Sequence, residues 1–359
     1  MGLRVFRPMA PAFVVGAGLL LHPALADPAR EASLEAVLAP LTADEIATRA
    51  SILESAAERR KALARRFAEG GAAAAPSLPG QGELTVPASL ERRILSVEDQ
   101  EREFFVFVPE GLTGPAPTLF ALHGGAATSG LQMHYKTDFT PMGAREGVVI
   151  VYPSGLRNGW NWDPDGRSAG SRIGAEGAKD FAFFGAMFDR LVADGLTDPA
   201  RIYVVGGSNG GSMSYALAHA MPERIAGTAI MVSIEPRVLA AGPPPARPMP
   251  ILIALGTLDP LMPWDGNEMG LPAEETIAYW CRVNACAGEP RVTLLPDRDP
   301  GDGTRVLEAR WEGAAPVAFY RLDGHGHGWP MVEESVSGPK TQDVSAPELF
   351  WAFLKDHRR

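Results

Sequence analysis

Residues 204–213 read VVGGSNGGSM, and this stretch decides the fold. Ser208 lies among four glycines, the first two of which directly follow the apolar run 202–205. The stretch matches the pattern G-x-S-x-G, in which a tight turn between a strand and a helix exposes a serine nucleophile. The pattern alone is weak, because glycine-rich strand–helix turns also occur where the serine does no chemistry. It needs a strand before it, a helix after it, and an acid and a histidine later in the chain.

Short apolar segments alternate with helical segments on both sides of Ser208. We expect strands at 90–95, 103–108, 118–122, 148–152, 202–205, 225–232, 251–255, 292–295, 305–311 and 317–322, and helices at 180–192, 208–220, 274–280 and 346–355. This alternation favours an α/β fold, with a mainly parallel central sheet and helices on both faces. In such sheets the reactive groups gather at the carboxyl ends of the strands.

Two strands after Ser208 end in residues suited to acid–base chemistry. The strand at 251–255 runs into GTLDP, which places Asp259 at its end, and Asp265 is the competing acid deeper in the same loop. The last interior strand is followed by DGHGHGWP, which contains His325 and His327. A carboxylate would hold the imidazole in the required tautomer and stabilise the imidazolium. The order serine, acid, histidine is that of α/β hydrolases.

A third strand end offers donors for an oxyanion. The strand at 118–122 ends in HGGA, and a glycine there lets the backbone approach a substrate closely. We expect the N–H groups of Asn209 and Gly125 to form an oxyanion hole. His123 precedes the serine, so we expect a structural role for it. His325 and His327 also match a zinc pattern, but no third or fourth ligand follows by spacing, so we predict no metal and no cofactor.

The N-terminus has the three parts of a secretory signal. Arg4 and Arg7 precede an apolar stretch at 10–21, and Ala24-Leu25-Ala26 forms a cleavage site. We therefore predict a signal peptide at 1–26 and a secreted or periplasmic protein without membrane contact after cleavage. The alternative is an uncleaved membrane anchor. Residues 27–69 are expected to form a helical extension, 70–82 a linker, and 83–359 the catalytic domain.

Charge and cysteine content narrow the partners. The formal net charge of −10 argues against nucleic acid and anionic membranes. The two cysteines, Cys281 and Cys286, predict a disulfide in an exported chain, with two free thiols as the alternative. The stretch DRDPGDG at 297–303 is similar to a calcium loop, but its glycine and aspartate stand in the wrong order, so we expect a polar turn.

Together these motifs resemble a known family, the secreted polyhydroxybutyrate depolymerases and feruloyl esterases of the α/β-hydrolase fold. The resemblance covers residue 83 to the end and rests on LHGG at 122–125, YPSG at 152–155, WNW at 160–162, DFAFFGAMFDRL at 180–191, DPARIYVVGGSNGG at 198–211, GTLDPLMPW at 256–264 and HGWP at 327–330. It implies Ser208 as nucleophile, Asp259 as acid and His327, rather than His325, as base.

The resemblance also points to aromatic residues near a substrate. These are Trp160, Trp162, Trp264 and Trp329. Two features depart from the family: it often has a cysteine in the oxyanion loop, where this chain has HGGA, and the extension at 27–69 lies outside the match.

The function that the sequence predicts is a serine esterase. It would act through an acyl-enzyme on hydroxyalkanoate esters or on feruloyl or acetyl esters of sugars. The alternatives are acyl transfer to a sugar or lipid acceptor and a non-catalytic carbohydrate-binding protein.

Overall fold

A computed structural model describes residues 30–55, 84–125, 128–163, 165, 179–332 and 338–359. Within this part of the chain, eleven strands form one sheet in the order β1-β9-β10-β11-β8-β7-β6-β4-β5-β3-β2. The central strands run parallel and are β5 (Val149–Pro153), β4 (Ala116–Leu122), β6 (Thr197–Gly207), β7 (Gly227–Met231), β8 (Ile251–Gly256) and β11 (Val317–Asp323). The predicted signal peptide at 1–26 and linker at 70–82 lie outside the described residues.

Antiparallel strands close both edges of the sheet. On one side, β3 (Gln100–Phe107) pairs with β5, and β2 (Glu91–Val97) pairs with β3. On the other side, β10 (Arg305–Trp311) pairs with β11 and β9 (Arg291–Leu294) with β10. The prediction of a mainly parallel sheet is confirmed, with the antiparallel pair at 90–108 in place.

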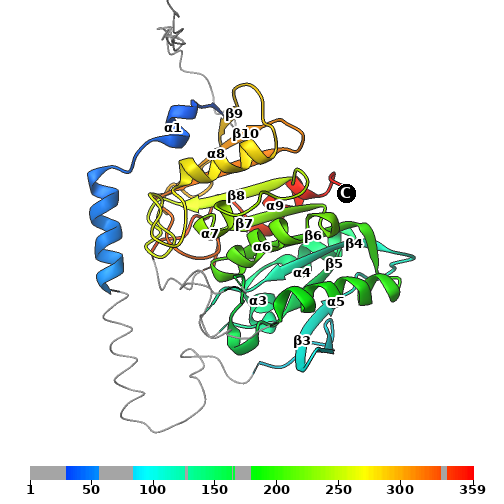
Figure 1. Cartoon of the computed structure of the whole chain (residues 1–359). Coiled ribbons are helices and arrows are strands. Elements are labelled where there is room, and N and C mark those ends of the chain that lie inside the picture. Colours follow the sequence, from blue (N-terminus) through cyan, green and yellow to red (C-terminus); the bar gives the residue numbers. More distant parts are fainter. Residues whose placement is uncertain (1–29, 56–83, 126–127, 164, 166–178, 333–337) are drawn as a thin grey trace, which may run out of the picture.

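Helices cover both faces of the sheet (Figure 1). One face carries α1 (Leu34–Leu38), α5 (Asp180–Ala193), α6 (Asn209–Ala220) and α8 (Ala273–Val283), and the other carries α3 (Gly130–Lys136), α4 (Phe139–Glu146) and α9 (Ala346–Leu354). Shorter helical turns are η1 (Leu156–Asn158), η3 (Pro222–Arg224) and α7 (Arg237–Ala240). The sequence analysis did not predict α3 and α4, since such short helices carry little apolar periodicity.

The strands bury alternate residues in two separate cores. In β6, Ile202 and Val204 pack with α5 and α6, whereas Tyr203 and Val205 pack under α9. All four side chains are at most 1% exposed. Burial on both faces explains why these strands read as continuous apolar runs in the sequence.

The N-terminal extension is partly built into the sheet. The short strand β1 (Arg30–Glu31) pairs with β9, and Val37 of α1, which packs against β10, is fully buried in the core. A further helix spans residues 43–55 and begins at a capping box, in which Thr42 and Glu45 exchange side-chain and backbone hydrogen bonds of 2.7 and 3.2 Å. The predicted helical extension is confirmed in its described part, except for Arg30 and Glu31, which pair with β9 as strand β1. Residues 56–69 lie outside the described part.

The predicted disulfide is also wrong in this structure. Cys281, near the end of α8, and Cys286 are both free thiols. The backbone N–H of Cys286 donates to the carbonyl oxygen of Cys281 at 2.8 Å, which closes a tight turn. Burial and a hydrogen bond to Cys286 raise the pKa of the Cys281 thiol, and burial raises that of Cys286.

No described helix is long and apolar enough to cross a membrane.

Candidate active site

Ser208 lies on a strained turn between β6 and α6. Its backbone has φ 55° and ψ −125°, which side-chain-bearing residues rarely adopt. The strain is held by the surroundings, since the N–H of Ser208 donates to the carbonyl oxygen of Met231 at 3.1 Å. The strand before the serine and the helix after it match the context that the G-x-S-x-G pattern requires.

Two glycines of the turn are required by close backbone contacts. A Cβ at Gly206 would lie less than 3.0 Å from the backbone of Gly210, and a Cβ at Gly210 would lie as close to the carbonyl oxygens of Leu122 and His123. Both contacts are with backbone atoms, which cannot move aside as a flexible side chain would. These glycines therefore let α6 begin directly against the end of β4.

Asp259 and His327 form a hydrogen-bonded pair at the same edge of the sheet. The histidine Nδ1 lies 2.8 Å from Asp259 Oδ2. The other carboxylate oxygen accepts the backbone N–H groups of Leu261 and Met262 at 2.8 and 2.9 Å. Asp259 is fully buried and His327 is 13% exposed at its side chain. An Nδ1–H that donates to the carboxylate leaves Nε2 free to accept a proton.

Hydrogen bonds join the loop that carries Asp259 to the loop that carries His327. The N–H of Thr257 donates to the carbonyl oxygen of Leu322 at 3.1 Å, and the N–H of Leu258 donates to the carbonyl oxygen of His325 at 3.0 Å. In return, the N–H of Gly324 donates to Thr257 Oγ1 at 3.0 Å. The spacing between the acid and the histidine is therefore set by backbone contacts between neighbouring strands β8 and β11.

His325 braces the histidine loop. Its Nε2 lies 3.1 Å from the carbonyl oxygen of Gly328, and its Nδ1 accepts the N–H of Thr341 at 3.0 Å. These two bonds assign the proton to Nε2. Burial lowers the pKa of His325 to about 4, so the ring is neutral at ordinary pH. Both nitrogens are occupied, which leaves His327 as the histidine with a free nitrogen.

The competing acid, Asp265, has a different partner. Its carboxylate accepts both guanidinium NH groups of Arg49, one of them at 2.9 Å. The structure thus brings Asp259, and not Asp265, to the histidine.

The loop after β4 lies directly beside the serine. A Cβ at Gly124 would stand 3.6 Å from Ser208 Cβ. His123 fixes this loop, because its Nδ1 lies 2.6 Å from the carbonyl oxygen of Gly124 while its Nε2 accepts the N–H of Gly155 at 2.8 Å. Burial lowers the pKa of His123 to about 4. The ring is therefore neutral, and its hydrogen bonds give His123 the structural role that the sequence analysis expected. Gly125, the predicted oxyanion donor, is the next residue of the loop after Gly124.

Asn209 has a structural task for its side chain. Its Oδ1 accepts the backbone N–H of Trp160 at 2.7 Å, and the Trp160 indole N–H donates to the carbonyl oxygen of His123 at 2.8 Å. The side chain therefore ties the elbow to the loop at 160–162 and leaves the backbone N–H of Asn209 for other use.

Three of the tryptophans predicted to contact substrate are almost fully buried. Trp160, Trp162 and Trp264 are 0, 4 and 6% exposed. Trp264 packs edge-on against Phe319 and lies 4.6 Å beneath the guanidinium of Arg321. All three rings belong to one hydrophobic core, and their contact with a substrate stays a prediction.

Trp329 is the predicted aromatic that remains partly exposed. Its six-membered ring lies about 3.0 Å from where a Cβ on Gly207 would stand, and it packs edge-on against Phe139 and Phe350. A cavity of about 340 Å³ beside it is also lined by Tyr135 and Met331, whose side chains are about half exposed. This cavity lies next to the histidine loop.

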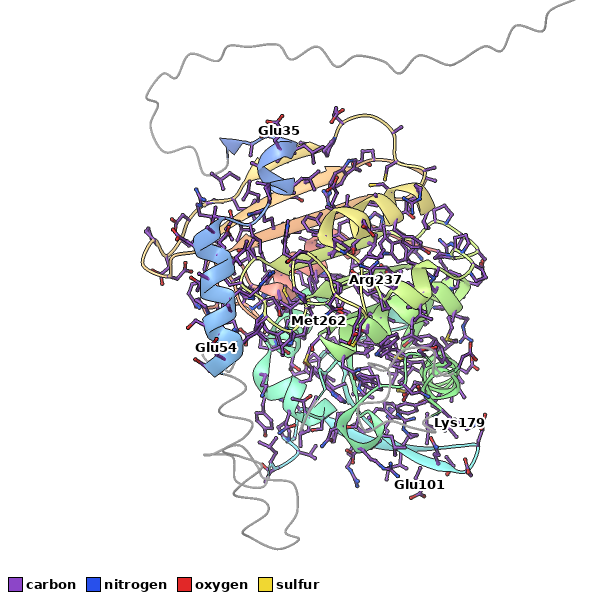
Figure 2. All side chains as sticks on the ribbon, turned by 60° about the vertical axis from the view of Figure 1, so that its left-hand side comes forward. Glu35, Glu54, Glu101, Lys179, Arg237 and Met262 are labelled. Carbon is purple, nitrogen blue, oxygen red and sulfur yellow. The ribbon has the colours of Figure 1, made fainter. Side chains whose placement is uncertain are left out.

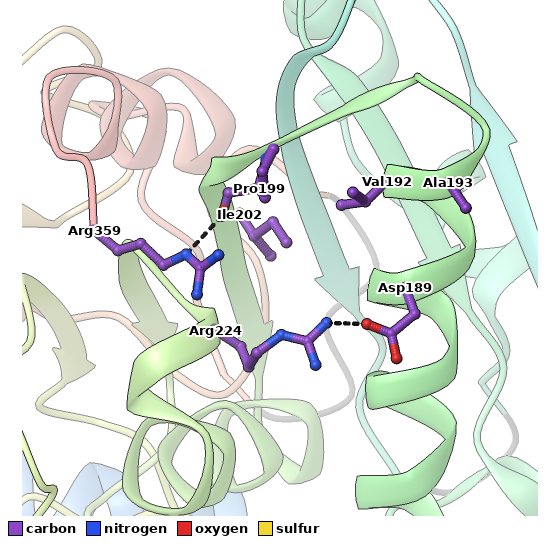
Figure 3. A pocket seen from close by; sticks show the side chains of 7 residues that line it. All are labelled: Asp189, Val192, Ala193, Pro199, Ile202, Arg224 and Arg359. Atoms are coloured by element: carbon purple, nitrogen blue, oxygen red, sulfur yellow. Dashed lines mark hydrogen bonds and ion pairs between the residues drawn. The ribbon is translucent and has the colours of Figure 1, made fainter.

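A larger cavity lies elsewhere. Its volume is about 410 Å³, and it lies near the first residues of β6, whereas Ser208 follows the last residue of that strand. Figure 3 shows the residues that line it. Its two arginines are occupied, Arg224 by the carboxylate of Asp189 at 2.6 Å and Arg359 by the carbonyl oxygen of Pro199 at 2.7 Å. It brings no candidate catalytic residue together.

Sequence reasoning missed one buried ion pair that supports the site. Arg102 of β3 contacts Asp180 at 2.5 Å, and both side chains are at most 1% exposed. The other oxygen of Asp180 accepts the N–H of Asn161 at 2.7 Å. Asp180, the first residue of α5, therefore holds the loop at 160–162. The two partners lie far apart in the chain, so no local signal could have paired them.

The described residues contain no group of three or more His, Cys, Asp or Glu side chains arranged to hold a metal ion. In the stretch at 297–303, Asp299 and Asp302 accept backbone N–H groups of Gly301 and Thr304 at 3.1 and 2.6 Å. This is the polar turn that the sequence analysis expected.

Comparison with known proteins finds similarity to esterases. The chain is 28% identical over 246 residues to NocK of Nocardia uniformis subsp. tsuyamanensis, which is named as an esterase, and the match covers 62% of this chain and 67% of NocK. It is 26% identical over 259 residues to feruloyl esterase B of Piromyces equi, covering 65% of this chain and 45% of that protein. It is 30% identical over 132 residues to poly(3-hydroxyalkanoate) depolymerase C of Paucimonas lemoignei, covering 35 and 30%.

The fold has a solved counterpart. The acetyl xylan esterase from Aspergillus awamori superimposes with a TM-score of 0.53 at 13% identity, covering 75% of this chain and 99% of that one. The chain therefore has the α/β-hydrolase fold, and its sequence is similar to feruloyl esterases, acetylxylan esterases and a poly(3-hydroxyalkanoate) depolymerase. It spans less than half the length of two of the curated relatives above, and no protein-family model matches it. These relatives are carboxylic ester hydrolases, which places this α/β hydrolase among esterases.

Proposed function

We propose that this α/β hydrolase cleaves carboxylic esters through Ser208, His327 and Asp259. The observation that carries the proposal is the 2.8 Å hydrogen bond between the buried Asp259 and His327, at the sheet edge where Ser208 stands on its strained turn. A non-catalytic binding protein has no need of a strained serine or of a carboxylate buried behind a histidine. Strain of this kind costs about 1–3 kcal/mol and persists where function requires it.

The residues have complementary tasks in an acyl-enzyme mechanism. Nε2 of His327 takes the proton of Ser208 Oγ while Oγ attacks the ester carbonyl carbon. The N–H groups of Asn209 and Gly125 stabilise the oxyanion of the tetrahedral intermediate. Its collapse breaks the bond to the alcohol, which leaves with the proton from His327. Water, deprotonated by His327, then attacks the acyl-enzyme and releases the acid and the free serine.

We propose hydroxyalkanoate esters and feruloyl or acetyl esters of sugars as the substrate class. The relatives' names supply these three chemistries. The cavity beside Trp329, with Tyr135 and Met331 on its wall, offers aromatic and apolar surface to an acyl group or a sugar ring. Side-by-side assays of methyl ferulate, acetylated xylan and hydroxybutyrate oligomers would rank the substrates.

The test of the proposed function is Ser208→Ala. We expect it to abolish hydrolysis of a short p-nitrophenyl ester while the melting temperature stays within a few degrees. Ser96→Ala, an exposed serine on β2, is the matched control and should keep full activity. Full hydrolysis by the Ser208 variant would exclude this serine as nucleophile.

We also propose that the protein is exported with removal of residues 1–26. Sequencing the N-terminus of the mature protein tests this, with Asp27 expected as the first residue and Met1 as the contradictory result.

A further inference from the structure

The helix at 43–55 lies outside the family resemblance, yet it contacts the loop that carries Asp259 and the strand that leads to His327. It runs along one side of the body, with Glu54 near its end, on the side that also presents Met262 of the loop after β8 (Figure 2). Most residues of this helix are exposed. Within it, only Glu45, Arg49 and Ile52 are partly buried. These three stand at i, i+4 and i+7, so one narrow stripe of the helix makes the contact.

The stripe touches the loop that carries the catalytic acid. Arg49 forms the two-pronged ion pair with Asp265, and its side chain is only 13% exposed. Asp265 follows Asp259 in the same loop between β8 and α8. A planar guanidinium that holds both carboxylate oxygens fixes direction as well as distance.

The same stripe also touches the neighbouring strand. Glu45 lies 3.8 Å from the guanidinium of Arg321, which in turn contacts Asp323 at 2.5 Å and covers Trp264. Because β11 leads directly into the histidine loop, this network joins the helix to both sides of the Asp259–His327 pair.

A third contact reaches the segment that follows the histidine loop. The side chain of Ile52 lies 3.0 Å from where a Cβ on Gly338 would stand. The next residue, Pro339, accepts the N–H of Gly326 at 2.8 Å, and Gly326 directly precedes His327. The helix is thus one or two contacts from each residue that holds the acid and the base.

We propose that the helix at 43–55 positions the Asp259–His327 pair, with Arg49 as its principal positioning residue acting through Asp265. The inference rests on the proposed function of that pair. It identifies the N-terminal extension as part of the machinery that keeps the acid loop in place, rather than as an appendage on the hydrolase.

Charges around the pair give this proposal a distinctive signature. Among the described residues, Arg49, His325 and Lys340 interact electrostatically with Asp259, and His325 also interacts with His327. Removing Arg49 leaves Asp265 unpaired, and its negative charge favours the imidazolium. Removing the charge of Asp265 leaves Arg49 unpaired, which disfavours the imidazolium. The two changes therefore act in opposite directions on protonation, although both break the same contact.

The experiment compares Arg49→Gln, Asp265→Asn and the exchanged double variant R49D/D265R in the full chain. With a p-nitrophenyl ester, each single variant should lose about 10-fold in kcat at nearly constant KM, since small displacements of catalytic groups cost about that much or more. The acid limb of the kcat/KM profile should move to higher pH in Arg49→Gln and to lower pH in Asp265→Asn. The double variant should recover most of kcat.

Controls separate positioning from folding and from the proposed function. Titration with a fluorophosphonate counts the folded, active fraction of each variant, so kcat refers to active enzyme only. Arg145→Gln breaks an exposed ion pair with Glu348 between α4 and α9 and should leave kcat unchanged. The positioning role would be overturned if both single variants kept the wild-type kcat. It would also be overturned if the acid limbs of their kcat/KM–pH profiles did not shift in opposite directions. If Ser208→Ala remained inactive in that case, the proposed function would stand without it.

Discussion

On the serine side of the site, the backbone itself fixes the geometry, whereas on the acid–histidine side the geometry depends on contacts between segments far apart in the chain. Ser208 is held by glycines that let β6, α6 and the end of β4 approach one another. Asp259 and His327 are held by hydrogen bonds between loops, by His325 and by the helix at 43–55. Close backbone contacts therefore fix the position of Ser208. The positions of Asp259 and His327 depend on the residues that support their loops, so substitutions of those residues can change them.

The largest expected effect comes from the acid itself. Asp259→Asn keeps the side-chain shape but replaces the charged carboxylate with a neutral amide. The amide no longer fixes the proton of His327 on Nδ1, so the imidazole loses its required tautomer. We expect kcat to fall by about 10³–10⁴-fold in steady-state assays, since this is the loss seen when the acid of such a triad becomes an amide. Asp297→Asn, on the polar turn, is the matched control and should be silent. A loss for Asp259→Asn no greater than that for Asp265→Asn would break the distinction between the two carboxylates.

The serine side should respond to a methyl group. Gly210→Ala places a Cβ against the carbonyl oxygens of Leu122 and His123, so α6 and β4 must separate. We expect a loss of about 3 kcal/mol in the free energy of unfolding, measured by urea denaturation, together with loss of activity. Gly114→Ala, which meets no atom within 4 Å, should change neither. A stable and active Gly210→Ala would show that the turn is less constrained than the contacts indicate.

A smaller effect is expected from pH. His123 and His325 are buried and neutral, with pKa values of about 4 against 6.5 in the unfolded chain. The unfolded state therefore takes up protons first, and stability present above pH 6.5 is lost as the pH falls toward 4. Each histidine contributes at most about 3 kcal/mol to this loss. Urea denaturation between pH 7 and 4 measures it.

The variant His325→Gln refines this prediction. It should flatten the decline in stability because one of the two titrating groups is gone, and it should lower kcat through the histidine loop. An unchanged decline would mean that His325 does not titrate as a buried group.

The sequence could predict the residues at strand ends but not those that support them. Ser208, Asp259 and His327 each follow an apolar strand, and parallel strands bring their carboxyl ends to one edge. Their placement therefore followed from pattern and order. The resemblance already favoured Asp259 over Asp265, and the structure adds the 2.8 Å contact between Asp259 and His327.

Supporting contacts have no local signature. Arg49 and Asp265 are 216 residues apart, and Arg102 and Asp180 are 78 apart, so only the fold pairs them. The burial of the tryptophans has no local signature either, because an indole suits a substrate site and a core equally well. The edge strand β1 has only two residues, too few for a periodic pattern.

The most direct test of the central claim is to map where a fluorophosphonate binds. The reagent should phosphorylate one serine per chain, and mass spectrometry of peptides should place the adduct on Ser208. Hydrolysis of a p-nitrophenyl ester should fall in proportion to labelling and reach zero at one equivalent. An adduct on another residue, or hydrolysis that persists after full labelling, would contradict the account.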